Sequence, residues 1–281
     1  MHSKGYTASL FAVALLSSVI GFGSAASAQT AATTKDYTPA VGQEGKDVIW
    51  VPTPQSLVER MLQMAGTKST DYVVDLGSGD GRTVITAAKK FGANALGIEY
   101  NPEMVELAKR NAEKEGVAGK TQFMKADIFQ TDFSKANVLT LYLLPSLNVK
   151  LRPTILNMRP GTRVVSHAFT MDDWQPDQTD SSEGRTAYMW IVPAKVTGTW
   201  TLDAPGARNA ETTFTQQYQN IGGSAKVDGN VAQVSNGKLR GETITFSLDG
   251  REFSGRVAGD KIEGTVKGGG DGKFTATRTR S

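Results

Sequence analysis

One short segment constrains the fold of this chain more than any other. Val73-Val74-Asp75-Leu76-Gly77-Ser78-Gly79-Asp80-Gly81-Arg82 passes from an apolar run into a helical pattern, with three glycines at the transition. Glycines permit a tight turn and let the backbone approach a ligand, while the N-terminus of the following helix favours an anionic group. The segment predicts a strand, a ligand-binding loop and a helix in that order, although a plain strand-to-helix turn would also use such glycines.

Short apolar runs and helical patterns alternate around this loop. Apolar strands that alternate with helices are typical of a parallel sheet with helices packed on both faces. The expected strands are 72–76, 95–99, 122–126, 138–143 and 163–167, and the expected helices are one capped by Ser56 that runs up to Gly66, then 82–91, 102–115 and 147–158. The pattern predicts an α/β domain over residues 47–193, closed by a further strand at 188–192.

The remaining residues, 194–281, have a different character. No helical pattern appears there, and half of the chain's 30 glycines lie in this part. Apolar and polar residues alternate between Gly, Asp and Asn turns, which predicts a second, all-β domain forming an antiparallel meander or barrel. Its composition leaves open whether it binds an envelope ligand or packs on the first domain.

The N-terminus reads as a targeting segment. Lys4 precedes the apolar stretch 8–23, and Ala26-Ser27-Ala28 has the small-x-small form of a cleavage site. Residues 1–28 therefore predict a signal peptide and an exported protein, periplasmic or secreted after cleavage following Ala28, while an uncleaved anchor is the alternative. The Ala- and Thr-rich residues 29–46 predict a flexible linker.

Composition excludes several classes of site. The chain has no cysteine and two histidines, of which His2 would leave with the signal peptide. Without disulfides, thiolates or a pair of imidazoles, we expect no metal centre of the zinc type. A net charge of +3 from 31 basic and 28 acidic residues gives no reason to expect a nucleic-acid partner.

Two details of the glycine loop narrow its ligand. The dinucleotide fingerprint expects a glycine or alanine at position 82, where this chain has Arg82, so a nicotinamide or flavin is disfavoured. Asp75 two residues before Gly77 gives an acidic-x-Gly-x-Gly-x-Gly pattern, which resembles motif I of the class I methyltransferases. That resemblance implies a Rossmann-like fold and S-adenosylmethionine as cofactor, with Gly77, Ser78 and Gly79 around its methionine end and Asp75 positioning its ammonium group.

Acidic residues follow the next two strands. Glu99 ends the second strand about 20 residues after the loop, where nucleotide-binding sheets place the acid that accepts hydrogen bonds from ribose hydroxyls. Asp127 ends the third strand, and by the same resemblance it would accept from the adenine amino group, with Ile128 beside the ring. A solvated strand-end glutamate and a turn aspartate are the alternatives.

A closer resemblance covers about half of the chain. The motifs Val48-Ile49-Trp50-Val51-Pro52-Thr53-Pro54, Leu141-Tyr142-Leu143-Leu144-Pro145 and Val164-Val165-Ser166-His167 are similar to those of bacterial relatives of the mitochondrial lysine methyltransferases that modify ATP synthase c subunit and the adenine nucleotide translocase. By this likeness Pro52 and Thr53 help to cover the cofactor, and Tyr142 faces the methyl acceptor. The polar-Pro-Pro-aromatic motif of amide- and adenine-N-methylating enzymes is absent after the fourth strand.

Methyl transfer requires little from side chains beyond alignment of the attacking atom and exclusion of water. Tyr142 and His167 are the candidate catalytic residues, with aromatic packing and a structural histidine as the alternatives. The resemblance implies a protein-lysine N-methyltransferase, and the predicted export makes an envelope protein the expected substrate. A small-molecule methyltransferase and a non-catalytic cofactor-fold module that presents a β binding domain are the competing interpretations.

Overall fold

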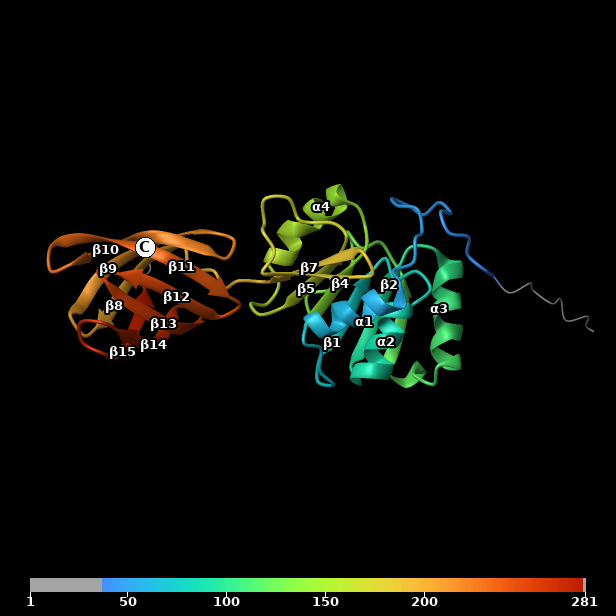
Figure 1. The fold of residues 1–281 in the computed structure, drawn as a ribbon, viewed down its shortest axis with the longest axis horizontal. Helices are drawn as coiled ribbons and strands as arrows, with labels where there is room; N and C mark the ends of the chain where they lie inside the picture. The colour runs from blue at the N-terminus through green and yellow to red at the C-terminus, as the bar shows by residue number, and fades with distance from the viewer. Residues whose placement is uncertain (1–36, 280–281) are drawn as a thin grey trace, which may run out of the picture. The chain divides into compact units, whose positions relative to one another are not determined.

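The computed structural model describes residues 37–279, so the predicted signal peptide 1–28 and residues 29–36 of the predicted linker lie outside the described residues. Two β structures follow one another along this part of the chain (Figure 1). The first is a seven-stranded sheet with helices, and the second is a closed barrel built from eight strands.

The sheet has the order β3-β2-β1-β4-β5-β7-β6. Its strands are β1 (Tyr72–Leu76), β2 (Asn94–Glu99), β3 (Thr121–Lys125), β4 (Val138–Leu141), β5 (Arg163–His167), β6 (Gln178–Ser182) and β7 (Arg185–Ile191). The first five pair in parallel, whereas β7 is antiparallel to both β5 and β6. The predicted parallel sheet is confirmed, and the β6–β7 hairpin makes the whole sheet mixed.

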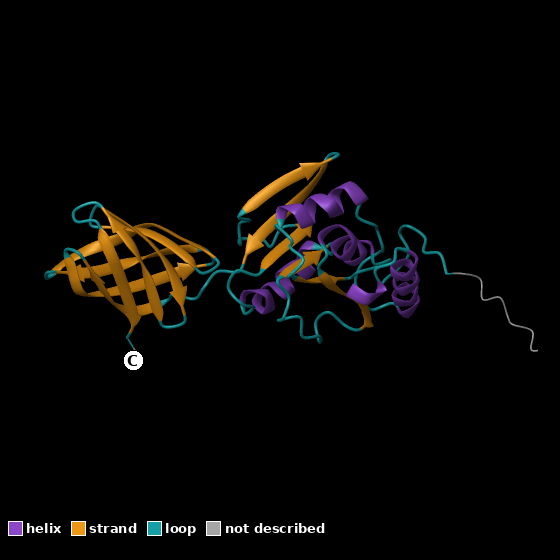
Figure 2. Cartoon of the chain, turned by 90° about the horizontal axis from the view of Figure 1, so that it is seen from below, coloured by secondary structure: helices purple, strands orange, loops and turns teal. Residues whose placement is uncertain are grey.

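Helices cover both faces of this sheet (Figures 1 and 2). They are α1 (Gln55–Met64), α2 (Arg82–Phe91), α3 (Pro102–Lys114) and α4 (Pro145–Leu156), with a short 3-10 turn at Ala118–Lys120. Successive strand residues point to opposite faces, so Val73 packs in one apolar cluster with α1 and α2 while Val74 packs in the other with α4. This two-sided burial explains why the strands read as continuous apolar runs.

The boundaries of several elements differ from those expected. Helix α4 begins at Pro145 rather than at residue 147, because Pro is well suited to the first turn of a helix, where its missing N–H costs no bond. Strand β4 ends at Leu141, which leaves Tyr142 and Leu143 in the loop beyond the sheet edge. Strand β6 was not expected at all, because its residues are polar and mostly exposed on the edge of the sheet.

The second structure is a closed antiparallel barrel, so the predicted antiparallel β domain is confirmed in its barrel form. Its strands are β8 (Gly198–Ala204), β9 (Ala207–Gln217), β10 (Asn220–Val227), β11 (Asn230–Arg240), β12 (Thr243–Leu248), β13 (Arg251–Ala258), β14 (Lys261–Lys267) and β15 (Gly272–Arg278). The barrel closes because β15 pairs with β8. Closure removes the exposed edges that an open meander would present.

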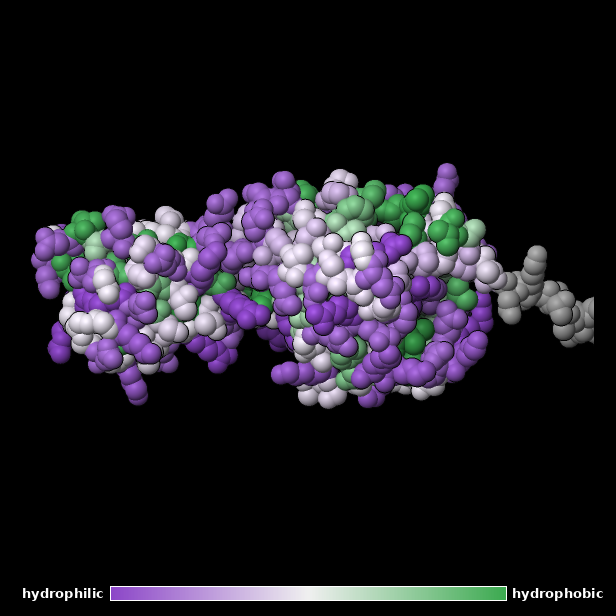
Figure 3. Space-filling model, viewed as in Figure 1, coloured by the Kyte–Doolittle hydropathy of each residue, from purple (hydrophilic) through white to green (hydrophobic). Residues whose placement is uncertain are grey.

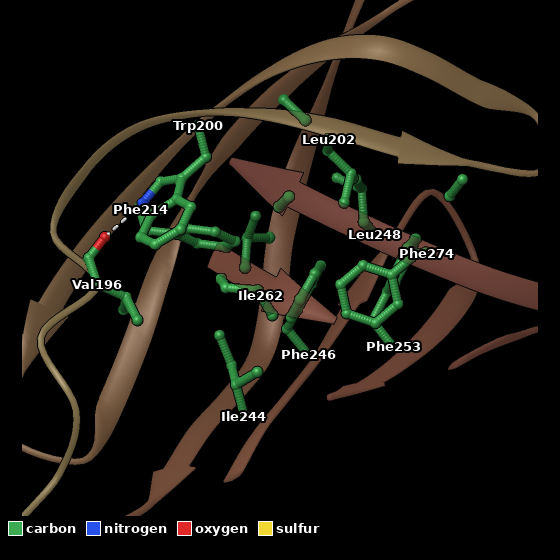
Figure 4. Packing of buried hydrophobic residues seen from close by; sticks show 14 of the residues in the cluster. Val196, Trp200, Leu202, Phe214, Ile244, Phe246, Leu248, Phe253, Ile262 and Phe274 are labelled. Carbon is green, nitrogen blue, oxygen red and sulfur yellow. Dashed lines mark hydrogen bonds between the residues drawn. The ribbon is translucent and has the colours of Figure 1, made fainter. Parts of the chain in front are cut away.

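Aliphatic and aromatic side chains fill the interior of the barrel (Figure 4). The rings of Phe246 and Phe253 stack with centroids 4.7 Å apart, and Phe274 meets Phe253 edge-on at 5.1 Å. Trp200 is fully buried, and its indole N–H donates to the carbonyl of Val196 at 2.8 Å. The inward-facing positions thus form a packed core of the kind expected for a small barrel.

The surface carries mixed polar and apolar residues. The face shown in Figure 3 is mostly hydrophilic, with small separate hydrophobic areas. Among residues 37–279, no helix is long and apolar enough to cross a bilayer.

Candidate functional site

A cleft of about 1060 Å³, including its open mouth, lies at the carboxyl ends of β1, β2 and β4. This is the edge at which open α/β sheets bind their ligands. Ten of the predicted site residues line it, and His167 does not. The ten are Pro52, Thr53, Asp75, Gly77, Ser78, Gly79, Glu99, Asp127, Ile128 and Tyr142.

The glycine loop after β1 is held in a left-handed backbone conformation. Gly79 has a φ of +51°, and a Cβ there would lie 2.6 Å from the indole nitrogen of Trp50. Gly81 has a φ of +83°, and a Cβ there would lie 2.8 Å from both Ala108 and Phe123. The amides of Gly77 and Ser78 donate to the carbonyl of Ile98. The loop is therefore fixed to β2 in a shape that other residues could not adopt without strain.

Glu99 supports this loop from the end of β2. One of its carboxylate oxygens accepts from the amide of Gly79 at 2.9 Å, and the other accepts from the amide of Asn101 at 2.9 Å. A carboxylate oxygen has two acceptor sites. Each oxygen of Glu99 thus keeps one free site, and a vicinal diol has the spacing to donate to both.

Asp75 lies deeper in the cleft and is 6% exposed. Its carboxylate accepts from the hydroxyl of Thr140 at 2.6 Å. Burial raises the pKa of Asp75 to about 7, with the charges of Glu99 and Asp80 acting in the same direction against the hydrogen bonds from Thr140 and Thr83. A cationic group bound beside Asp75 would stabilise its ionised form.

Asp127 has two partners at the far end of the cleft. Its carboxylate accepts from the amide of Phe129 at 2.9 Å and from the ammonium of Lys46 at 2.7 Å. The hydrogen bond from Lys46 is the main cause that holds the pKa of Asp127 below its usual range. Lys46 also lies 5.0 Å from the ring centre of Tyr100, so an adenine amino group at Asp127 would share this corner with a lysine.

The segment before α1 forms one side of the cleft. Its chain turns back on itself, with a bridge between Glu44 and Ile49 and a hydrogen bond from the Gly42 amide to the Trp50 carbonyl. Trp50 packs on the glycine loop, and Lys46 reaches Asp127. Neither residue was among the predicted site residues. Trp50 stood inside a motif that the resemblance had pointed to, whereas Lys46 lay in the expected linker with no signal to mark it.

Apolar and aromatic side chains surround the end of β4. Tyr142, Leu143 and Leu147 line the cleft there. The ring of His167, at the end of β5, lies behind Tyr142 with the ring centres 3.8 Å apart and the planes inclined by 31°. The ring of Phe169 stacks on Tyr142 at 6.1 Å. This end of the cleft can remove water from an apolar stem bound against Tyr142.

No group of three or more His, Cys, Asp or Glu side chains within residues 37–279 has the arrangement of a metal site.

Comparison with known proteins identifies relatives of the sheet domain. A family model described as the ANTKMT methyltransferase domain matches residues 75–178. A protein-lysine N-methyltransferase of Saccharolobus islandicus is 42% identical over 151 residues, which are 52% of this chain and 94% of that protein. An adenine nucleotide translocase lysine N-methyltransferase of Mus musculus is 34% identical over 105 residues, which are 37% of this chain and 46% of that protein.

A solved structure gives the same picture of the fold. An RNA methyltransferase of Salinibacter ruber in complex with S-adenosyl-L-homocysteine is 50% identical, with a TM-score of 0.51, over 52% of this chain and 96% of that one.

The cleft has the groups that S-adenosylmethionine requires. Glu99 offers free acceptor sites for two ribose hydroxyls, and the buried carboxyl of Asp75 suits the ammonium of the methionine end. Asp127 has acceptor capacity at the corner that also holds Ile128. The residues present therefore fit this cofactor, with Lys46 and Trp50 as further groups that a bound molecule would contact.

Proposed function

Because this chain belongs to the class I S-adenosylmethionine-dependent methyltransferases, in the family of the ANTKMT methyltransferase domain, we propose that it methylates the side-chain nitrogen of lysine residues in a protein. The proposal takes its direction from the Saccharolobus relative, whose name gives protein lysine as the acceptor. The Salinibacter relative is named for RNA, so the acceptor has to be argued from the cleft itself.

The charge of the residues that line the cleft favours lysine over RNA as the methyl acceptor. Its lining includes six acidic residues (Glu44, Asp47, Asp75, Asp80, Glu99, Asp127) and two basic ones, Lys46 and Arg82. Both basic residues are already paired, Lys46 with Asp127 at 2.7 Å and Arg82 with Asp80 at 2.6 Å. RNA binding relies on unpaired cations that neutralise phosphates. Asp75, Glu99 and Asp127 serve the cofactor, so the acidic excess of the lining disfavours a polyanion rather than forming the lysine site itself.

The reaction needs alignment, dehydration and a neutral amine. S-adenosylmethionine, when bound, supplies a methyl group made electrophilic by the adjacent sulfonium. Free lysine has a pKa of about 10.4, so at pH 7 deprotonation withholds about 4.6 kcal/mol from the attack. The apolar wall of Leu143 and Leu147, with the ring of Tyr142, would desolvate the amine and lower this cost.

We also propose that the acceptor is an envelope protein. The support is the signal-peptide pattern of residues 1–28, which predicts export. S-adenosylmethionine is produced in the cytoplasm, so an exported enzyme requires a supply of cofactor that crosses the membrane.

Transfer of label to fractionated host extracts tests both parts. The purified chain is incubated with tritiated S-adenosylmethionine and with envelope or cytosolic extract, and the product is divided by protease, ribonuclease and filtration. We expect label that protease releases as methyl-lysine, and more of it from the envelope fraction. Glu99→Ala provides the cofactor-site control.

Each other distribution of label has a definite meaning. Label released by ribonuclease would move this chain to RNA methylation, and label in the filtrate would identify a small-molecule enzyme. Absence of label despite cofactor binding would leave the non-catalytic module. Methyl-lysine found only in cytosolic proteins would remove the envelope acceptor and keep the lysine chemistry.

A further inference from the structure

A continuous series of contacts joins the glycine loop to the wall of the acceptor side. Asp80 of the loop holds Arg82 at 2.6 Å, and Arg82 donates to the backbone carbonyl of Thr53 at 2.9 Å. The hydroxyl of Thr53 lies 3.1 Å from Nδ1 of His167. The ring of His167 then packs against the ring of Tyr142 with centres 3.8 Å apart. Thr53 is thus fixed by its backbone to the cofactor loop and by its side chain to β5.

The position of His167 does not suit a general base. The residue is 1% exposed, and Thr53 and Tyr142, rather than His167, line the cleft. A base must come within hydrogen-bonding reach of the proton that it removes. Burial lowers the pKa of His167 to about 4, and the positive charge of Arg185 acts in the same direction. At pH 7 the imidazole is therefore neutral and would hold a proton only weakly.

We propose that His167 is a positioning residue, which fixes the ring of Tyr142 relative to the cofactor loop through its hydrogen bond to Thr53. The inference rests on methyl transfer in this cleft, but it is independent of which acceptor is used. In-line transfer depends on the distance and angle between the attacking atom and the methyl group, and a displacement of about 1 Å can lower the rate about 100-fold.

Substitutions of matched size separate positioning from catalysis. Thr53→Val removes the hydroxyl and keeps the shape, Thr53→Ser keeps the hydroxyl, and His167→Phe keeps a ring against Tyr142. Thr162→Val is the control, because Thr162 is also buried but precedes β5, at the end opposite to His167.

We expect Thr53→Val and His167→Phe each to lower total tritium transfer from S-adenosylmethionine to host extract about tenfold. In His167→Phe, whose changed side chain does not line the cleft, the dissociation constant of the cofactor should stay within about twofold of the parent. Thr53→Ser should recover most of the rate. Both substitutions remove the same contact, the hydrogen bond between Thr53 and His167. The variant that carries both should therefore be no slower than the slower of the two single variants. His167→Phe should keep the pH dependence of the parent, whereas loss of a base would flatten it.

Nuclear magnetic resonance can detect the hydrogen bond between Thr53 and His167 without a methyl acceptor. The full chain has two histidines, so ¹⁵N-histidine labelling gives two ring-nitrogen signals from each, and His167→Phe identifies those of the ring at the end of β5, of which the Nδ1 signal is followed. We expect this signal to remain that of a neutral imidazole from about pH 8 down to about pH 5, and to move in Thr53→Val but not in Thr162→Val.

Three results would overturn the inference: titration of His167 near pH 6.5, an unmoved signal in Thr53→Val, or additive losses in the double variant. Failure of the proposed lysine specificity would appear in a different measurement: the unsubstituted protein would transfer label to an acceptor other than lysine.

Discussion

Replacement of Glu99 by alanine should weaken cofactor binding by a predictable amount. In the structure each carboxylate oxygen accepts one backbone N–H, from Gly79 or Asn101, and keeps one site for a ribose hydroxyl. Loss of hydrogen bonds to a charged group costs about 1.5 to 3 kcal/mol, which is about 10- to 150-fold in the dissociation constant. Glu99→Gln should fall near the lower limit, because its amide nitrogen cannot accept and replaces one of the two acceptors.

Calorimetric titration with S-adenosylmethionine measures this loss directly. Glu113→Ala is the control, because Glu113 is an exposed acid on α3 that does not line the cleft. Thermal unfolding of each variant shows whether the glycine loop is still folded. An affinity for Glu99→Ala within about twofold of the parent would refute the assignment of Glu99 to the ribose.

Three further predictions concern the rest of the chain. Folding raises the pKa of Asp75 from 3.8 to about 7, so between these pH values the folded state binds a proton that the unfolded state has released. Thermal unfolding should therefore show that stability falls as pH rises through this range. The same titrations should show that Asp75→Asn removes this dependence. A chain ending at Pro193 should be soluble, folded by circular dichroism and still bind cofactor, because the cleft is lined, within the described residues, by side chains from 43–147. Intact mass of the protein from the host's envelope should correspond to a chain beginning at Gln29, and retention of residues 1–28 would contradict cleavage.

The sheet domain could be predicted from sequence because its signals are local. Buried parallel strands read as apolar runs, and the glycine loop between Leu76 and Arg82 marks where one strand ends and a helix begins. Strand β6 escaped because it is a polar edge strand with no apolar alternation. The sequence did not distinguish a closed barrel from an open meander, because closure depends on pairing between β15 and β8, which are far apart in the chain.

In the cleft, too, some residues could be predicted from the sequence and others depended on contacts between distant parts of the chain. Asp75 and Glu99 lie at the carboxyl ends of β1 and β2, and Asp127 comes just after β3. The ends of neighbouring parallel strands meet at one edge, so the grouping of these acids followed from topology. The ion pair of Lys46 with Asp127 joins residues 81 positions apart, and nothing in the local sequence indicates it. The burial of His167 behind Tyr142 could not be predicted from sequence either. A lone histidine at the end of a strand gives the same sequence pattern whether it is a general base or a buried structural residue.

The rate of a single turnover as a function of pH tests the proposed attack by a desolvated lysine most directly. With saturating S-adenosylmethionine, so that ionisation of Asp75 does not limit binding, the rate should climb about tenfold per pH unit. It should level at an apparent pKa below the value of about 10.4 for free lysine, because the apolar wall beside Tyr142 disfavours the charged amine. A flat profile from about pH 6 to about pH 9, or label on RNA, a hydroxyl or a small metabolite, would contradict the account.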